Sequence, residues 1–334
     1  MKKTLKRLAD PFARVFWRAM IGLMQACPPV CGMIADGAYR AHLSQFKSLL
    51  PLAARVPRML LLHWRDKREK RVALAQVYIG VTTRCTLYCD KCTMHLSDLS
   101  RHEDMPTDEL LGDIRALLAC VDHIYDFCFG GGEPFLHPDL DQAIRLCAES
   151  GKIGNLKILI NGTVVPGGKV LAALRDAGAQ VNVSNYRPMS QTEVDDLIAV
   201  LTEHGISYNI YPAARDYWVD TGSFGQLKDG SPAWRFRFCF LRLYNTYIDG
   251  LLHLCPQSAV LTYDGRLPQN EADYINMRAV DPAAFRGIYQ KLNKRTELPA
   301  CAYCLGQTYK TPKIPAAAQR VPMEPINLEK EPLI

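Results

Sequence analysis

The central part of this 334-residue sequence alternates between strand-like and helix-like segments, which restricts the folds open to the chain. Strand-like runs lie at 77–83, 123–129, 156–161, 180–184 and 206–211, and helix-like stretches lie between them at 107–119, 138–150, 167–177 and 190–204. Five β-then-α units indicate an α/β fold, a parallel sheet wrapped by helices, open or barrel-like. In such sheets ligands bind at the carboxyl ends of the strands.

Three cysteines follow the first of these strands in a C-x3-C-x2-C run formed by Cys85, Cys89 and Cys92. Thiolates at this density are ligands for a soft metal centre. Four would complete a tetrahedral zinc site or a fully ligated iron–sulfur cube, whereas three leave one coordination position open. The run lies at the carboxyl end of its strand, so we expect an open metal centre at the ligand-binding edge of the sheet.

The second strand ends in the motif GGGEP, residues 130–134. Glycines allow the backbone to approach a ligand closely, and Glu133 is delivered to the same edge as the cysteines. The motif alone is weak evidence, but one βα unit after C-x3-C-x2-C it is strong. Together the two motifs resemble the radical S-adenosylmethionine (radical SAM) enzymes, over roughly residues 76–215.

This resemblance implies a partial (β/α)6 barrel in which the three cysteines hold three irons of a [4Fe-4S] cluster and SAM chelates the fourth. Gly131, Gly132 and Glu133 would hold the SAM amino group. Asn161 and Ser184 stand at strand ends where the family contacts the ribose or carboxylate; ordinary strand-end polarity is the alternative explanation. One position departs from the family pattern: Lys91 precedes the third cysteine, where an aromatic residue near the adenine is usual.

A second cysteine group follows the alternating region, formed by Cys239, Cys255, Cys301 and Cys304. The Asp249–Gly250 pair between the first two predicts a β-hairpin that brings Cys239 and Cys255 together at its base. By cysteine count alone, structural zinc and an iron–sulfur cluster are both open. The spacing resembles the radical SAM branch with a SPASM or shorter twitch extension, which implies one auxiliary [4Fe-4S] cluster with four protein ligands.

The resemblance implies a barrel at 76–215, followed by a linker and auxiliary region at 216–310. Composition and charge set two further parts apart: a basic helical extension at 1–75 and a proline-rich, extended tail at 311–334. Residues 1–71 hold 15 Lys or Arg and 4 Asp or Glu, so the net charge of +6 comes from this extension. A solvated helical cap and a surface in peripheral contact with anionic lipid both fit it. No apolar run is long enough to span a membrane, and charges interrupt the signal-like amino terminus, so we expect a cytoplasmic protein.

The resemblance implies reductive cleavage of SAM to a 5′-deoxyadenosyl radical, which abstracts a hydrogen atom from a substrate. We expect a carbohydrate or cyclitol substrate, free or within a glycan, oxidised or epimerised at a carbinol carbon. Asp216 and Trp218 lie in an acidic and aromatic linker that suits a sugar, with a packed interdomain loop as the alternative. Cys128 is the candidate hydrogen donor for epimerisation; a small buried side chain is the alternative.

Two other functions fit less well: modification of a ribosomally made peptide, and a metal-stabilised binding scaffold without enzymatic activity. The expected partner is a reductant such as flavodoxin or ferredoxin, and no nucleic acid is expected.

Overall fold

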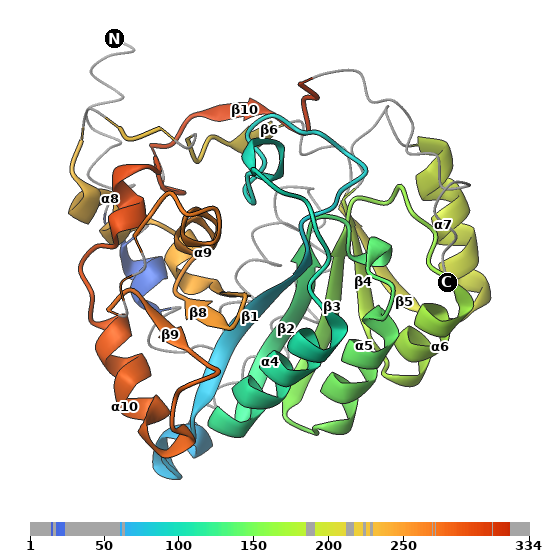
Figure 1. Cartoon of the computed structure of the whole chain (residues 1–334), viewed down its shortest axis with the longest axis horizontal. Helices are drawn as coiled ribbons and strands as arrows, with labels where there is room; N and C mark the ends of the chain where they lie inside the picture. Colours follow the sequence, from blue (N-terminus) through green and yellow to red (C-terminus); the bar gives the residue numbers. More distant parts are fainter. Residues whose placement is uncertain are drawn as a thin grey trace.

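The protein, examined as a computed structural model, is an α/β structure around one mixed sheet (Figure 1). The structure describes residues 15, 18–23, 61, 64–184, 191–211, 217–222, 225–227, 230–268, 270, 272–308 and 310–320. Most of the predicted amino-terminal helical extension lies outside these residues, as do Asp216 and the tail beyond residue 320. In the described part of the chain, no helix is long and apolar enough to cross a membrane.

The predicted alternation is confirmed. Five strands form from the apolar runs: β1 (Ala73–Thr82), β2 (His123–Gly131), β3 (Ile153–Ile160), β4 (Gln180–Ser184) and β5 (Ser207–Tyr211). The helices between them are α4 (Thr107–Cys120), α5 (Leu140–Glu149), α6 (Gly168–Asp176) and α7 (Gln191–Glu203). Neighbouring strands pair in parallel in the order β5-β4-β3-β2-β1, as consecutive β-then-α units require.

The hairpin predicted at Asp249–Gly250 is also present, between β7 (Asn245–Ile248) and β8 (Leu251–His253). Both turn residues have positive φ, 47° and 74°, as a two-residue hairpin turn requires. The hairpin does not form a separate sheet. Strand β7 pairs in parallel with β1, and β9 (Tyr274–Asn276) adds an antiparallel edge, so the C-terminal part extends the main sheet to eight strands.

The remaining elements surround the carboxyl ends of the strands and the C-terminal edge of the sheet. They are η2 (Leu96–Asp98), η3 (Pro134–Leu136), β6 (Tyr217–Val219), α8 (Pro232–Phe238), η4 (Leu241–Leu243), α9 (Pro256–Tyr263), α10 (Pro282–Asn293), η5 (Pro299–Ala302) and β10 (Lys313–Pro315). Strands β6 and β10 form a small antiparallel sheet, which lies beside the loop after β1 at the top of Figure 1. Segments far apart in sequence therefore meet at the edge where ligands bind.

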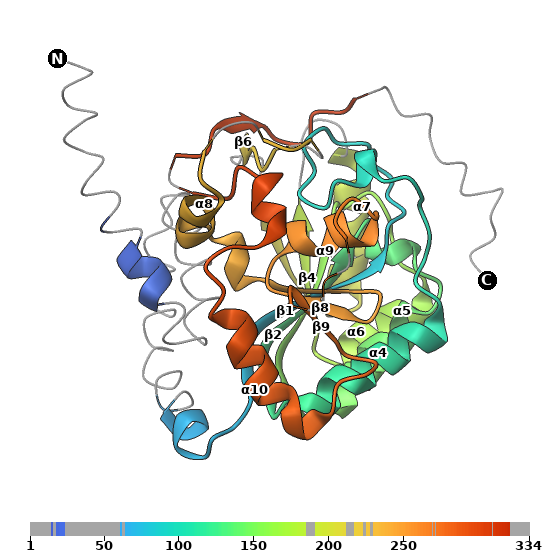
Figure 2. The same cartoon turned by 60° about the vertical axis from the view of Figure 1, so that its left-hand side comes forward.

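The two faces of the main sheet differ in chemistry. Phe127, Phe129, Ile158 and Val181 are fully buried and belong to the hydrophobic core shared with the helices. Because side chains alternate along a strand, the residues between them face the opposite side, called here the inner face. Figure 2 shows α10 lying alongside α4 at the outer margin of the helical layer.

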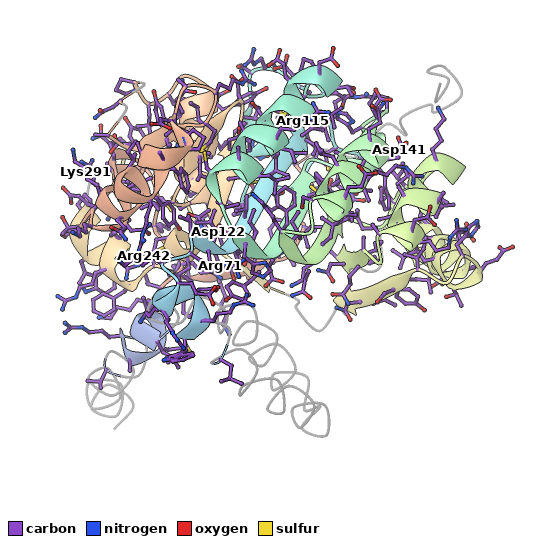
Figure 3. The ribbon with its side chains drawn as sticks, turned by 90° about the horizontal axis from the view of Figure 1, so that it is seen from below. Arg71, Arg115, Asp122, Asp141, Arg242 and Lys291 are labelled. Atoms are coloured by element: carbon purple, nitrogen blue, oxygen red, sulfur yellow. The ribbon has the colours of Figure 1, made fainter. Side chains whose placement is uncertain are left out.

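The amino ends of the strands are closed by polar contacts on the side seen in Figure 3. There the Asp122 carboxylate accepts a 2.7 Å hydrogen bond from the Val72 amide, and its carbonyl accepts one of 3.3 Å from Arg71. These contacts fix the starts of β1 and β2 side by side. The opposite edge is left for the cysteine loop.

Candidate functional site

The loop after β1, which carries the three cysteines, is fastened directly to the GGGEP turn after β2. The Gly132 amide donates to the Thr82 carbonyl at 2.7 Å, and the Glu133 amide donates to the Arg84 carbonyl at 2.8 Å. The Gly131 amide donates to the Tyr78 hydroxyl. The amides of Gly131, Gly132 and Glu133 are thus all used within the protein. A ligand amino group is itself a donor, so at this turn it would bind carbonyl or carboxyl oxygens.

The glycines of the motif are required by this packing. Gly131 has φ +115°, which disfavours any other residue, and a Cβ there would lie 2.3 Å from the Thr82 carbonyl oxygen. A Cβ at residue 132 would lie 1.8 Å from the Arg84 carbonyl oxygen. The sequence indicated glycines for close approach to a ligand; in the structure they allow two loops to approach each other.

Glu133 is completely buried and joins the ends of two strands. Its carboxylate accepts hydrogen bonds from the Asn161 amide at 2.8 Å and the Phe135 amide at 3.3 Å. Burial raises the pKa of this carboxyl to about 8, against the opposing effect of the two amides. The contact of Glu133 with the SAM amino group stays a prediction. The structure adds that the Glu133 carboxyl holds the end of β3 beside the turn after β2.

Asn161 reaches the first cysteine. Its side-chain amide donates to Thr86 Oγ1 at 2.9 Å and lies 3.5 Å from the Sγ of Cys85, while its Oδ1 accepts from the Thr163 amide at 2.9 Å. This residue therefore positions the cysteine loop whether or not it also contacts a ligand. Ser184 ends β4 in a half-buried position at the same sheet edge.

Two of the three thiols pack against apolar side chains. Cys85 and Cys92 pack against a cluster formed by Met94, Leu96, Ile248, Ala259 and Val260. Burial raises the pKa of all three thiols, to about 12 for Cys85 and about 11 for Cys89. Thiolates here need a compensating positive charge, which bound iron supplies.

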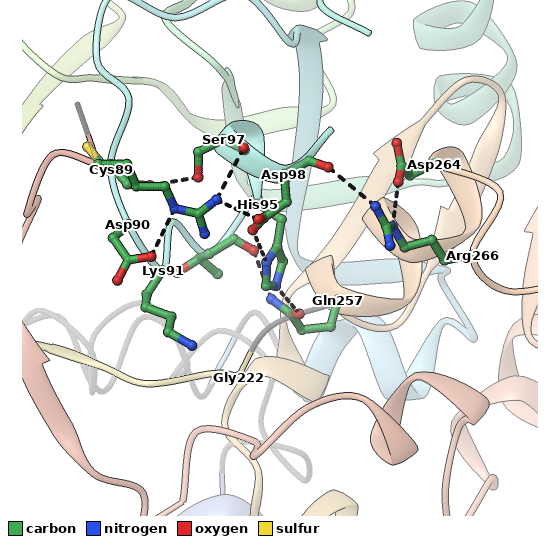
Figure 4. A network of polar contacts seen from close by, with 12 residues as sticks. Cys89, Asp90, Lys91, His95, Ser97, Asp98, Gly222, Gln257, Asp264 and Arg266 are labelled. Atoms are coloured by element: carbon green, nitrogen blue, oxygen red, sulfur yellow. Dashed lines mark hydrogen bonds and ion pairs between the residues drawn. The ribbon is translucent and has the colours of Figure 1, made fainter. Parts of the chain in front are cut away.

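Two residues of the loop adopt left-handed backbone conformations and connect it to the C-terminal half (Figure 4). Lys91, with φ 56°, occupies the position where the family has an aromatic residue, and its Nζ lies 3.9 Å from Asp220. His95, with φ 49°, is buried and contacts Gln257 Oε1 through Nε2 at 2.7 Å. Gln257 also donates to the Thr93 carbonyl at 2.8 Å, so its amide bridges two points of the loop.

The four later cysteines line one small cavity, as the hairpin and spacing predicted. Cys239 ends α8, Cys255 caps the amino end of α9, and Cys301 and Cys304 lie in and just after η5. Gln257 lines the same cavity, and its side chain contacts the cysteine loop, so this residue lies between the two cysteine groups.

Backbone amides already point at the sulfur atoms of this cavity. The Gly306 amide donates to Cys304 Sγ and the Gln307 amide to Cys239 Sγ, each at 3.2 Å, and the Ser258 amide donates to Cys255 Sγ at 3.4 Å. Hydrogen bonds to sulfur stabilise thiolates and set the potentials of iron–sulfur clusters. Among the described residues, no three His, Cys, Asp or Glu side chains are grouped tightly enough for a single metal ion. A cluster distributes its thiolates over several irons and does not need such a group.

Another cavity, of about 270 Å³, adjoins the GGGEP turn. Its wall includes Gly80 and Gly131 from the sheet, Met94 from the cysteine loop, and Ile248 and Tyr263 from the C-terminal part. The cysteine loop and the hairpin thus enclose space next to the predicted SAM site.

The profile of the radical SAM superfamily matches residues 79–208, which contain both the cysteine run and the GGGEP turn. This segment is a radical SAM domain. The matched segment runs from within β1 into β5 and so covers the five parallel strands. This radical SAM protein has no match among curated proteins.

Solved structures give distant fold likenesses. The chain is 20% identical to anSMEcpe with bound AdoMet over 40% of this chain and 42% of that one, with a TM-score of 0.34. It is 18% identical to BtrN in complex with AdoMet and 2-DOIA, over 69% and 92%, with a TM-score of 0.42. It is 14% identical to Streptococcus suis SuiB bound to the precursor peptide SuiA, over 76% and 74%, with a TM-score of 0.37. The match therefore spans about two fifths of the first of these proteins.

Membership of the superfamily implies SAM and a [4Fe-4S] cluster, and the donor set fits them. Three thiols follow β1 and would leave one iron of a cluster for SAM, and buried Glu133 places a carboxyl group at the adjoining turn. Sequence reasoning missed Tyr78, because it lies within the strand-like run of β1 and belongs to no motif. It missed Gln257 and Gln319, because both reach the site from distant segments. Cys128 is buried on the inner face of β2, and Trp218 lies in β6.

Proposed function

We propose that this enzyme abstracts a hydrogen atom from a carbohydrate or cyclitol and oxidises or inverts a carbinol carbon. The observation that carries the proposal is the chemistry of the inner face, where hydrogen-bonding side chains replace the apolar ones of the helical side. They come from neighbouring strands and comprise Gln76, Tyr78, Asp126, Lys157, Asn182 and Asn209. Such a surface suits a ligand whose own surface is largely hydroxyl groups.

These side chains hold one another in fixed positions. Lys157 Nζ lies 2.7 Å from the Asp126 carboxylate, which also accepts from Asn155 at 3.0 Å. On the far strands, Asn209 donates to Asn182 at 3.2 Å. Polar groups that are already ordered lose little entropy when a polyol binds, which favours specific recognition.

Two metal groups are assigned to the two cysteine sets. Cys85, Cys89 and Cys92 would hold the SAM-binding cluster, and Cys239, Cys255, Cys301 and Cys304 an auxiliary [4Fe-4S] cluster. When bound and reduced by a one-electron donor such as flavodoxin or ferredoxin, SAM and its cluster supply the 5′-deoxyadenosyl radical. The protein supplies orientation and a dry, polar-lined site.

Removal of the hydrogen atom leaves one unpaired electron on the carbinol carbon. This substrate radical can then be oxidised or can regain a hydrogen atom. In oxidation, the hydroxyl proton passes to solvent and the electron passes to the auxiliary cluster, which gives a ketone. In inversion, a thiol returns a hydrogen atom to the opposite face, and the external reductant restores the thiol with one electron and one proton.

Cys128 is the proposed donor for inversion. It occupies the inner face of β2, and its Sγ lies 3.8 Å from the Gln76 amide. Burial raises its pKa to about 12, so the sulfur keeps the hydrogen that a donor needs. Trp218, half-buried in β6 at the carboxyl-end edge, is the proposed aromatic contact for a sugar face.

The test is anaerobic incubation of the reduced enzyme with SAM and candidate polyols in deuterated water. A ketone product indicates oxidation, and deuterium at one carbon without net oxidation indicates inversion. In the second case Cys128→Ala should stop deuterium incorporation while Cys147→Ala, a buried cysteine of the helical core, should not. Turnover of a peptide with no polyol turned over would refute the proposed substrate class.

A further inference from the structure

The C-terminal segment 317–320, called here the strap, pairs with the cysteine loop. The Asp90 amide donates to the Ala318 carbonyl at 2.6 Å, and the Arg320 amide donates to the Tyr88 carbonyl at 3.0 Å. Cys89 and Gln319 form an antiparallel bridge between these two bonds. A segment 230 residues later in sequence therefore adds a short strand directly to the loop that carries the second cysteine.

The Gln319 side chain adds a hydrogen bond to the Cys89 sulfur to this backbone pairing. Its Nε2 donates to Cys89 Sγ at 3.0 Å and to the Ala317 carbonyl at 2.9 Å. Its Oε1 accepts from the Tyr88 amide at 2.6 Å. The neighbouring amide and carbonyl fix which end of the side chain is the donor, so the N–H group is the one that faces the sulfur.

Arg320 anchors the strap from its other end. Its Nε lies 3.0 Å from the Asp90 carboxylate, and its Nη1 lies 2.6 Å from the Asp98 carboxylate and 3.3 Å from the Ser97 carbonyl. The guanidinium thus joins both sides of the loop. Figure 4 shows its three partners, Asp90, Ser97 and Asp98, within the same network of polar contacts.

The strap continues from the second cysteine group. Cys304, Gly306 and Gln307 lie at the start of the same segment, where the last two donate amide hydrogen bonds to cysteine sulfur. The chain then passes through β10 and reaches Gln319. One segment, 304–320, therefore supplies hydrogen bonds to sulfur atoms of both cysteine sets.

We propose that Gln319 is a positioning residue that raises the reduction potential of the cluster held by Cys85, Cys89 and Cys92. This inference rests on the proposed assignment of that cluster. An N–H···S hydrogen bond withdraws electron density from the thiolate, which favours the more negative, reduced cluster. The strap holds the donor in place through Arg320 and covers the loop on that side.

The test compares the midpoint potential of the cluster in wild type, Q319L and Q319E, by redox titration of the EPR signal that responds to SAM. Q319L removes the donor, and Q319E keeps the acceptor for the Tyr88 amide while placing a carboxylate beside the sulfur. At a fixed applied potential we expect the ratio of reduced to oxidised cluster to fall about threefold in Q319L and about tenfold in Q319E. Q142L, on the exposed side of α5, should leave the ratio unchanged.

The possible results distinguish failure of the role of Gln319 from failure of the cluster assignment on which that role rests. A wild-type protein with no SAM-responsive iron–sulfur signal would refute the cluster assignment itself. A wild-type signal with the same midpoint potential in Q319L and Q319E would refute the role of Gln319 and leave the assignment intact. Should Q319L retain too little iron to titrate, Q319E alone decides, since it preserves the bond to Tyr88.

Discussion

The backbone of Gly132 lies so close to the carbonyl of Arg84 that a Cβ at residue 132 would be 1.8 Å from the carbonyl oxygen. The neighbouring Glu133 amide donates to that same oxygen at 2.8 Å. The turn after β2 therefore fixes the start of the cysteine loop after β1. Glycine serves here to bring two loops of one site into register before any ligand binds.

Replacement of Gly132 by alanine should displace the cysteine loop, because the clash is with backbone that cannot move alone. We expect G132A to lose most of the iron bound by Cys85, Cys89 and Cys92 after anaerobic reconstitution. The matched control is G112A in α4, where a Cβ meets nothing within 4 Å. That variant should keep its iron and gain about 0.5–1 kcal/mol of stability, since alanine favours a helix. Normal iron content in G132A would contradict the packing argument.

Replacement of Cys255 should empty the second cysteine site without affecting the first. We expect C255A to hold about four irons per chain where wild type holds about eight. Cys147, buried behind the sheet in α5, provides the control, and C147A should keep the wild-type iron content. Zinc in the wild-type protein, measured with the iron by elemental analysis, would contradict the auxiliary-cluster assignment.

Gln257 should stabilise the cysteine loop, because its amide satisfies both buried His95 and the Thr93 carbonyl. Q257L removes the partner of His95 Nε2 and the donor to the Thr93 carbonyl, which should cost about 1–3 kcal/mol in the free energy of unfolding. Anaerobic urea denaturation measures this, with Q142L as an exposed control expected within about 0.5 kcal/mol of wild type. Equal urea midpoints for Q257L and wild type would show that the contacts of Gln257 do not stabilise the fold.

Arg278 joins the hairpin to α4. Its guanidinium contacts Asp113 at 2.7 and 3.0 Å, Glu109 at 2.9 Å and Asp249 at 3.2 Å. Asp113 is buried but Arg278 is partly exposed, so solvent screening limits the gain. We expect D113N to lower the free energy of unfolding by about 1–3 kcal/mol, whereas E203Q at the exposed end of α7 should change it by less than about 0.5 kcal/mol. Equal losses in the two variants would contradict a specific role for this contact.

Local patterns predicted the elements well, because strand and helix periodicity and the Asp249–Gly250 turn are properties of short segments. The helix predicted at 107–119 appears as α4, Thr107–Cys120. The pairing of β7 with β1 was not predictable in this way, since it joins strands about 170 residues apart. For the same reason the tail, expected to be extended, gave no sign that Gln319 would reach Cys89. The first cysteine set was visible in the sequence because Cys85, Cys89 and Cys92 lie in one short run. The second was visible because a hairpin turn separates Cys239 from Cys255 and because Cys301 and Cys304 form a C-x2-C pair.

The most direct test of the central claim is 5′-deoxyadenosine formation by the anaerobically reconstituted, reduced enzyme with SAM, compared between wild type and Cys85→Ala. We predict that wild type forms 5′-deoxyadenosine and that C85A, which lacks one of the three thiolates, forms none. Equal amounts from the two proteins, or none from wild type with reduced clusters and varied polyols, would contradict the assignment of this loop to radical initiation.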